Sequence, residues 1–276
     1  MEIFGGKSAG IKMAASGLIY RHFGKRLLTT IYPNLAEDEF SLNIAYNKLY
    51  SRLIKEVDAE DNGIDPWSGV EGFKPLYSTH TNLGARVGML NVWWCEDYSQ
   101  EKENTRFMEA VEICRTELLS QMKWVVENFL PARKIVQEAY AKREGPIMII
   151  EGKCGPWKEH LFEIEAEAKA EEPVLNVVSF DRGRQQWNCI CVPDSPQSFG
   201  LRLGFPPEWR GLRNEELEKV SGIKGTVFTH ASGFMGSNET KEGAIEMARR
   251  SAELQKDKMP EVMQLFKSTR DLYAST

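Results

Sequence analysis

The sequence predicts an α/β protein with a helical first half and a mixed second half, and three observations lead to this prediction. Its 276 residues, 42% hydrophobic and 27% charged, are typical of a globular protein large enough for two domains. Apolar residues recur at helical spacing up to about residue 143. Short apolar runs separated by Pro and Gly follow. We therefore expect one domain over residues 1–143 and a second over residues 144–276.

Apolar residues at steps of three and four predict the helices of the first domain. The stripe from Leu42 to Val57 predicts a helix that ends near Gly63, and residues 12–28 predict an earlier helix. A longer stripe consists of Phe107, Val111, Cys114, Leu118, Met122, Val125 and Phe129. Pro131 should kink or end this third helix, because proline lacks the backbone N–H and its ring clashes with the preceding turn.

Four short apolar runs predict strands in the second domain. They cover residues 147–150, 174–180, 186–192 and 226–229. The segment from Asp181 to Arg184 fits a hairpin connection between the second and third runs. Side chains alternate along a strand, so Trp187, Cys189 and Cys191 share one face, and we interpret the two cysteines as core residues. Residues 240–255 predict a helix after the last strand.

Composition excludes several classes of protein. A net charge of −5 lacks the basic excess of a non-specific nucleic-acid binder, so such a substrate would need a local patch. Five cysteines without a CxxC pair predict neither a disulfide framework nor a zinc site, and they favour a reducing compartment. No apolar run is long enough to span a membrane. The four histidines never stand at metal-ligand spacing.

An acidic segment lies at the C-terminal end of a predicted helix, where the helix dipole disfavours negative charge. Its carboxylates are Glu56, Asp58, Glu60 and Asp61. Asp58 and Asp61 would share one helix face, and carboxylates are the ligands that Mg²⁺ or Mn²⁺ prefers, so these two residues are metal-ligand candidates. The alternative is a solvated helix end capped by Gly63.

A second candidate site lies at residues 226–237, which we expect to form a strand and a glycine loop before the next helix. Backbone N–H groups at such a helix start can bind phosphate. The substrate-binding candidates are Arg210, Arg213, His230, Ser232, Gly233 and Gly236. An ordinary βα turn explains the glycines equally well, and the interleaved glutamates before the loop favour a mixed-charge solvated surface.

Several long segments match motifs of one known family: residues 16–24, 56–64, 130–133, 156–161, 209–213 and 220–234. Through them the chain resembles the melanocyte-proliferating-gene exonuclease family, a branch of the DHH phosphoesterase superfamily. The resemblance implies that residues 1–143 are the C-terminal portion of a DHH-type parallel-sheet domain rich in helices. Residues 144–276 would form a smaller mixed α/β substrate-binding domain. The implied activity is 3′-to-5′ exonuclease cleavage of RNA.

The sequence departs from the family at the metal motifs. The family pattern has a His-Asn-Gly-x-Phe-His-x-Asp-Glu segment, a lone Asp and an Asp-His-His-Gln segment, and none of the three is present here. In complete relatives, two Mn²⁺ or Mg²⁺ ions would lower the pKa of a bridging water. Only Asp58 and Asp61 carry over to that site. We therefore expect an N-terminally truncated member that is inactive on its own.

Three hypotheses follow from the resemblance. The chain is an exonuclease whose sequence lacks its N-terminal part, or a short form that binds RNA or a partner without hydrolysis. The third is a structural or regulatory protein that forms a homo-oligomer or pairs with a complete relative. Single-stranded RNA is the expected partner, with no membrane. The resemblance implies the nucleus and the mitochondrion, whereas a genuine short form would be cytoplasmic.

Overall fold

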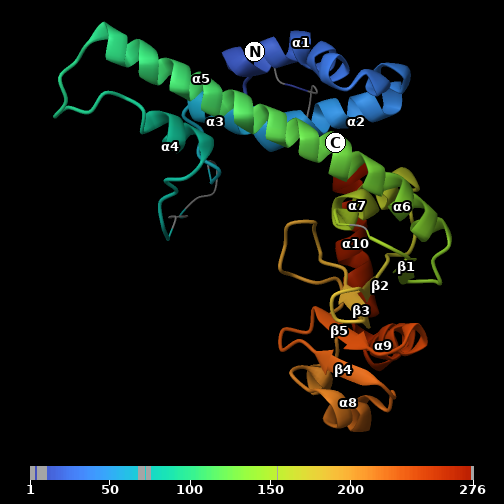
Figure 1. Cartoon of the computed structure of the whole chain (residues 1–276). Coiled ribbons are helices and arrows are strands. Elements are labelled where there is room, and N and C mark those ends of the chain that lie inside the picture. The colour runs from blue at the N-terminus through green and yellow to red at the C-terminus, as the bar shows by residue number, and fades with distance from the viewer. Residues whose placement is uncertain (1–3, 5–10, 68–71, 73–75, 154, 275–276) are drawn as a thin grey trace. The chain divides into compact units, whose positions relative to one another are not determined.

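The computed structural model describes residue 4, residues 11–67, residue 72, residues 76–153 and residues 155–274. The fold is mixed α/β, which confirms the predicted class. Contacts divide the chain into two compact units, Met1–Leu130 and Pro131–Thr276 (Figure 1). The boundary expected at residue 144 lies between helix α6 (Leu130–Ala141) and strand β1 (Ile147–Ile150).

Helices make up the regular structure described in the first unit. They are α1 (Ala15–Ile31), a 3₁₀ turn (Pro33–Glu37), α2 (Glu39–Leu49), α3 (Lys55–Asp61), α4 (Leu83–Gly88) and α5 (Gln100–Lys123). A π-helical turn at Tyr50–Ile54 joins α2 to α3 without a break. The predicted helix ending near Gly63 is confirmed, because Asn62 is the C-cap and Gly63 follows with φ 66°.

The long helix predicted around residues 107–129 continues beyond Pro131. A π-helical turn at Trp124–Phe129 connects α5 to α6, and Pro131 is the second residue of α6. Pro131 therefore does not end the helix. Wider π-type turns shift the backbone hydrogen bonding, so a residue without an N–H can follow such a turn without interrupting the helix.

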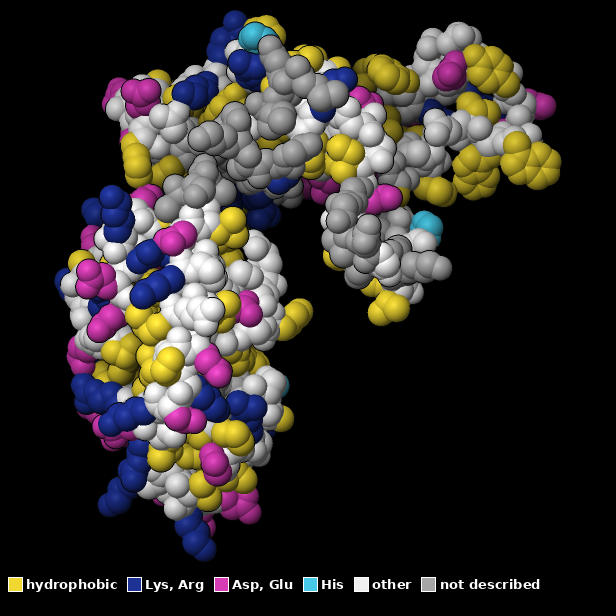
Figure 2. Space-filling view, turned by 180° about the vertical axis from the view of Figure 1, so that it is seen from behind, with side chains coloured by type: hydrophobic (Ala, Val, Ile, Leu, Met, Phe, Trp, Pro, Cys, Tyr) yellow, Lys and Arg dark blue, Asp and Glu magenta, His cyan; other side chains and the backbone are white. Residues whose placement is uncertain are grey.

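The core of the first unit is built where α1, α2, the Tyr50–Ile54 turn and the end of α5 meet. Its buried residues are Tyr20, Leu28, Leu35, Ala45, Leu49, Tyr50, Met122, Val125 and Val126. The earlier part of the α5 stripe is different, because Phe107 and Val111 are exposed. Exposed aromatic residues also stand between α4 and α5, including Trp94 at 97% exposure, and Figure 2 shows a gathering of hydrophobic side chains on this unit.

A five-stranded sheet organises the second unit. Its strands are β1, β2 (Asn176–Asp181), β3 (Gln186–Cys191), β4 (Thr226–Thr229) and β5 (Met235–Asn238), in the order β1-β2-β3-β5-β4. Strand β1 pairs with β2 in parallel, and the other pairs are antiparallel. The four predicted strands are thus confirmed, and β5 is a fifth that the sequence pattern did not predict.

The two faces of the sheet carry separate cores because side chains alternate along each strand. On one face Met148, Ile150 and Val177 pack with α6 and with α7 (Trp157–Glu167). On the other face Cys189 and Cys191 pack among apolar side chains of α8 (Asn214–Ser221) and α9 (Lys241–Leu254). The prediction that both cysteines are core residues is confirmed. Helix α10 (Met259–Ala274) packs on α7 (Figure 1).

The predicted strand at residues 226–229 and the predicted helix at residues 240–255 are confirmed as β4 and α9, but the glycine loop expected to lead directly from one to the other is wrong. Strand β4 is followed by a turn and then by β5, which pairs with both β3 and β4. Helix α9 begins only after Thr240, whose side-chain oxygen caps it by accepting from the Gly243 N–H. The glycine loop is therefore the tip of a β-hairpin and does not lead into a helix.

Candidate functional site

The tip of the β4–β5 hairpin, residues 230–234, carries three of the six predicted substrate-binding residues, His230, Ser232 and Gly233. The N–H of His230 donates to Met235, and the N–H of Gly233 donates to the carbonyl of His230, which closes the turn. The Ser232 N–H donates to Nδ1 of the His230 ring at 3.1 Å. Because Nδ1 accepts, the neutral ring carries its proton on Nε2. His230, Ser232 and Phe234 are exposed.

Strand β3, the neighbour of β5 in the sheet, and the loop that contains Phe205 hold this turn in place. The Phe234 carbonyl accepts from the N–H of Cys191 on β3, and the Gly233 carbonyl accepts from the N–H of Phe205. Gly233 has φ 74°, a backbone conformation that favours glycine. The position of the exposed side chains at the tip is thus set by backbone hydrogen bonds to buried elements.

Arg210 lies against the turn. A Cβ placed on Gly233 would come within 2.6 Å of Arg210 Nε, so the guanidinium packs where glycine leaves room. Arg210 Nε also donates to the Phe205 carbonyl at 2.9 Å. The segment after Arg210 runs antiparallel to β4, with Gly211 donating to the Thr229 carbonyl. The structure therefore brings Arg210, His230, Ser232 and Gly233 together.

Arg213 and Gly236 take different places. Arg213 pairs with Phe228 in an isolated antiparallel bridge, and its guanidinium lies 5.6 Å from the centre of the Phe228 ring. Gly236 is buried in β5, where a Cβ would approach Met247 and Phe205 at 2.7 and 3.2 Å. Arg213 remains an exposed cation farther along β4, whereas close packing explains the glycine at position 236.

A hollow of about 270 Å³ lies beside Arg210. Besides Arg210, its polar lining includes Arg202, Gln255, Lys258 and Glu261. Arg202 is not free to bind a ligand, because it forms a buried bidentate ion pair with Glu165 at 2.9 and 2.7 Å. Arg210 and Lys258 are the cations that face solvent here.

Charges of both signs cover the visible face of the second unit. Figure 2 shows Lys and Arg side chains interspersed with Asp and Glu over that face. This arrangement agrees with the mixed-charge surface that the interleaved glutamates indicated. On that face, a nucleic-acid contact would therefore depend on local groups of cations and not on a broad basic surface.

Asp58, the first metal-ligand candidate, is fully buried and caps helix α1. Its Oδ1 accepts from the Ala14 N–H at 3.1 Å, the Gly17 N–H at 2.8 Å and the Ser16 hydroxyl at 2.8 Å. Its Oδ2 accepts from the Tyr50 hydroxyl at 2.9 Å. Burial, followed by this hydrogen bond, raises the pKa of Tyr50. Both carboxylate oxygens of Asp58 are thus engaged by the protein.

The neighbouring carboxylates of α3 do not converge on Asp58. Asp61, the second candidate, is exposed at the end of α3. Glu60 accepts from the Asn82 side chain at 2.5 Å, and Asn82 in turn caps α4. Within the described ranges, no three His, Cys, Asp or Glu side chains are grouped as a metal site would require. None of the helices there has the length and apolar character to cross a bilayer.

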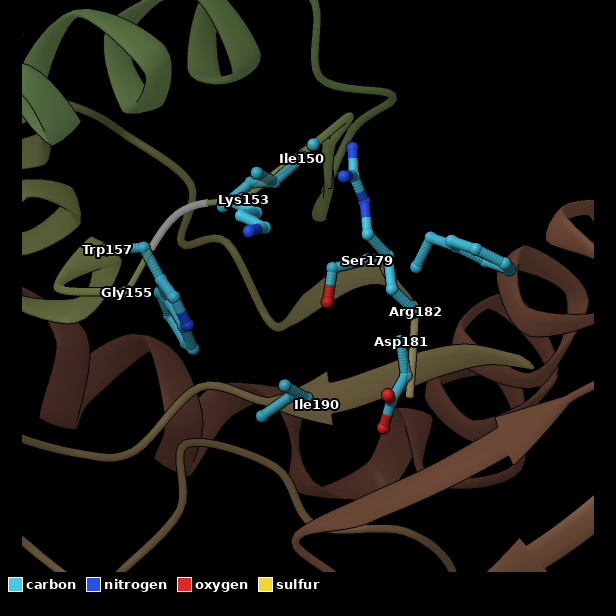
Figure 3. A pocket seen from close by; sticks show the side chains of 10 residues that line it. Ile150, Lys153, Gly155, Trp157, Ser179, Asp181, Arg182 and Ile190 are labelled. Atoms are coloured by element: carbon cyan, nitrogen blue, oxygen red, sulfur yellow. The ribbon is translucent and has the colours of Figure 1, made fainter. Parts of the chain in front are cut away.

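A second hollow, of about 370 Å³, lies where the loop after β1 approaches the β2–β3 hairpin (Figure 3). Its lining includes Lys153, Ser179 and Arg182, none of which the sequence reasoning selected. The sequence does contain a pattern that could indicate this hollow, because Gly152 and Gly155 stand between a strand and a helix. This is the pattern expected at residues 226–240, and it occurs between β1 and α7.

Comparison with known proteins identifies the family. Residues 2–252 match the MYG1 exonuclease family model, described as "Uncharacterised protein family (UPF0160)". The chain is 40% identical to "MYG1 exonuclease" of Mus musculus over 252 residues, covering 88% of the chain and 64% of that relative. Identity and coverage are the same for the Homo sapiens protein of that name, over 250 residues. "MYG1 protein" of Dictyostelium discoideum is 39% identical over 243 residues, or 86% of the chain and 72% of the relative.

No solved structure matches the chain significantly. The chain spans 64% of the length of its mouse and human relatives. The family model nevertheless covers nearly all of the chain, and the relatives named as exonucleases align along most of it. On this evidence, the chain belongs to the MYG1 exonuclease family.

Proposed function

We propose that the second unit binds single-stranded RNA for a metal-dependent 3′-to-5′ exonuclease of the DHH type, and that this chain alone binds RNA without hydrolysing it. The relatives named "MYG1 exonuclease" support a nuclease. The observation that carries the binding proposal is the exposed hairpin tip with Arg210 packed against it. The tip offers donors, an aromatic surface and a cation within one turn.

Each group at the tip suits one part of an RNA strand. The His230 and Phe234 rings lie 4.6 Å apart, and Phe234 is 37% exposed, so a base can stack there. Arg210 supplies charge for a phosphate, and Arg213 extends that charge along β4. His230 Nε2–H is a further donor, and the Ser232 hydroxyl, which donates to His230 Nδ1 at 2.9 Å, can still accept from a ribose hydroxyl. Binding through phosphate contacts should weaken as salt concentration rises.

The proposed cofactor of the exonuclease is Mn²⁺ or Mg²⁺, which would lower the pKa of a bound water. The candidate ligands do not fit that ion as they stand in this structure. Asp58 is buried and accepts four protein hydrogen bonds, so binding a metal would break the cap of α1. Asp61 is exposed, and a single carboxylate is a poor site for such an ion.

Titration of a short single-stranded RNA at low and moderate salt tests the binding proposal. Phe234→Ala and Arg210→Gln should each weaken binding about tenfold, in line with roughly 1–3 kcal/mol for a stacked base. His230→Ala should weaken it less. Lys219→Gln is the matched control, since it removes an exposed charge from α8 outside the tip. Unchanged affinity in the Phe234 and Arg210 variants, or no binding by folded wild type, would refute the proposal.

Gly233→Val is a poor probe of this site. The φ of 74° and the contact with Arg210 mean that valine would strain the turn and displace the guanidinium. For hydrolysis, the same RNA is incubated with Mn²⁺ or Mg²⁺ and the wild-type chain. We expect no cleavage above background. Metal-dependent cleavage that Asp61→Asn abolishes would show that the acidic segment is catalytic.

A further inference from the structure

The hollow beside β1 is built from two separate segments of the second unit. The loop after β1 contributes Gly152, Lys153 and Gly155, whereas the end of β2 contributes Ser179 and the turn after it contributes Arg182. Figure 3 shows the Lys153 and Ser179 side chains directed into the same space. Its volume of about 370 Å³ lies in the range of roughly 300–1,000 Å³ typical of small-molecule sites.

Two cations line this hollow without a partner. Neither the Lys153 ammonium nor the Arg182 guanidinium has an ion pair or hydrogen bond within the part of the chain that the structure describes. Among other cations of this unit, Lys241 is paired with Glu151 and Arg249 with Glu144, whereas Arg184 has no side-chain partner in the described part of the chain but lies outside the lining. Unpaired cations from two segments that converge on one hollow favour an anionic ligand.

Asp181 is the only carboxylate of the described residues lining the hollow, and most of its acceptor capacity is used by the hairpin. Its Oδ1 accepts from the Gly183 and Arg184 N–H groups at 2.9 and 3.1 Å. These bonds, that from Arg184 foremost, lower the pKa of Asp181 and keep it ionised. Its Oδ2 has one long contact, 3.5 Å to Asn188, so it can still accept a hydrogen bond from a ligand hydroxyl.

The remaining wall is apolar and partly flat. It includes Ile150, Phe180, Ile190 and the indole of Trp157, which is 7% exposed and projects into the hollow opposite Ser179 (Figure 3). A small inorganic anion would leave this wall unused, and a purely apolar ligand would leave two cations unused. The lining therefore fits a ligand that has an anionic end, a hydroxyl-bearing centre and a flat ring.

We infer that this pocket binds a nucleoside monophosphate, with the phosphate at Lys153 and Arg182 and the base against Trp157 and Ile190. Sugar hydroxyls would donate to Asp181 Oδ2 or bond to Ser179. The ligand is either a free nucleotide or the terminal unit of an RNA strand. Only the second source rests on the proposed function.

Calorimetric titration of the whole chain with AMP tests the inference. Lys153→Gln and Arg182→Gln should each weaken AMP binding about tenfold, because each removes one charged contact to phosphate. Arg184→Gln is the matched control, since Arg184 lies on the same hairpin outside the lining, and it should stay within twofold of wild type. Adenosine and inorganic phosphate should each bind at least tenfold more weakly than AMP.

The inference is overturned if folded wild type binds no AMP at millimolar concentration, or if both lining variants bind AMP as wild type does. Equal affinity for AMP and inorganic phosphate would also overturn it. Titration with terminally phosphorylated RNA separates the two sources. Weaker binding of that RNA by Lys153→Gln identifies a strand terminus, whereas loss confined to AMP identifies a free nucleotide. Phe234→Ala should leave AMP binding unchanged. A failure of the RNA-binding proposal at the hairpin tip can therefore be told apart from a failure of this inference.

Discussion

Asp58 caps a helix that starts more than forty residues earlier in the chain. The N-cap residue of α1 is Ala14, which has no side-chain oxygen to accept the first N–H groups of the helix. The Asp58 carboxylate takes that place and also satisfies two hydroxyls. The carboxylate packs so closely that a Cβ on Gly17 would collide with it. A residue selected as a metal ligand thus has a complete structural role.

Replacing Asp58 by Ala should lower the free energy of unfolding by at least about 3 kcal/mol. The substitution leaves two buried N–H groups and two hydroxyls without an acceptor, and each unsatisfied group costs roughly 1–3 kcal/mol. Asp61→Ala is the matched control and should change stability by less than about 0.5 kcal/mol, because Asp61 is exposed. Urea denaturation measures both. Equal stability of the two variants would contradict the capping role.

The cysteines should differ sharply in reactivity, because the thiolate is the reacting form. Burial raises the pKa of Cys191 to about 12 and raises that of Cys189 well above its usual range. Cys95 and Cys114 are exposed. Iodoacetamide at pH 8 should label the exposed pair in the native chain, and labelling of the buried pair should require denaturant. Peptide mass spectrometry reads each site, and native labelling of Cys191 at the rate of Cys95 would contradict this.

At the scale of elements, periodic segments were predictable and tertiary partners were not. The helix ending near Gly63 and the four apolar strands follow from residue spacing and from the propensities of apolar residues. Strand β5 has the sequence Met-Gly-Ser-Asn, without a β-branched residue, and it is a strand because β3 and β4 flank it. The site residues near it were selected by type, but hairpin geometry was needed to show which of them meet.

Gly236→Val should destabilise the second unit by roughly 1–3 kcal/mol, the usual range for overpacking a core. The added side chain would meet Met247, Phe205 and the backbone oxygen of Phe228. Gly155→Ala is the control, because a Cβ there has open space and its φ is not positive. Thermal melts of both variants test the difference. A Gly236→Val melt that matches wild type would show that β5 can shift to make room.

At the scale of the whole molecule, the chain comprises two units with separate cores. The first unit depends on helix packing and the Asp58 cap, and the second contains the buried Arg202–Glu165 pair. Removing one partner of such a pair is destabilising by about 3–5 kcal/mol, because the other charge stays buried. Substitutions in one unit should therefore affect mainly the stability of that unit.

Scanning calorimetry should resolve two unfolding transitions. Asp58→Ala should lower the midpoint of one, and Arg202→Leu should lower the midpoint of the other, since each variant disrupts a different core. The double variant should show both shifts. Near-UV circular dichroism of each single variant shows which unit unfolds in which transition. A single transition that both substitutions lower equally would mean that the units unfold as one.

The cap of α1 also bears on how water reaches that helix. Amide protons in the first turn of a helix ordinarily exchange with solvent quickly, because terminal residues fray. Here the Ala14 and Gly17 amides donate to a carboxylate carried by α3, so releasing them requires α1 and α3 to separate. Their deuterium uptake should then be as slow as that of the surrounding core. Amide exchange at the start of α1 would then resemble exchange in the protein interior, and its rate would be set by how often the helical unit opens.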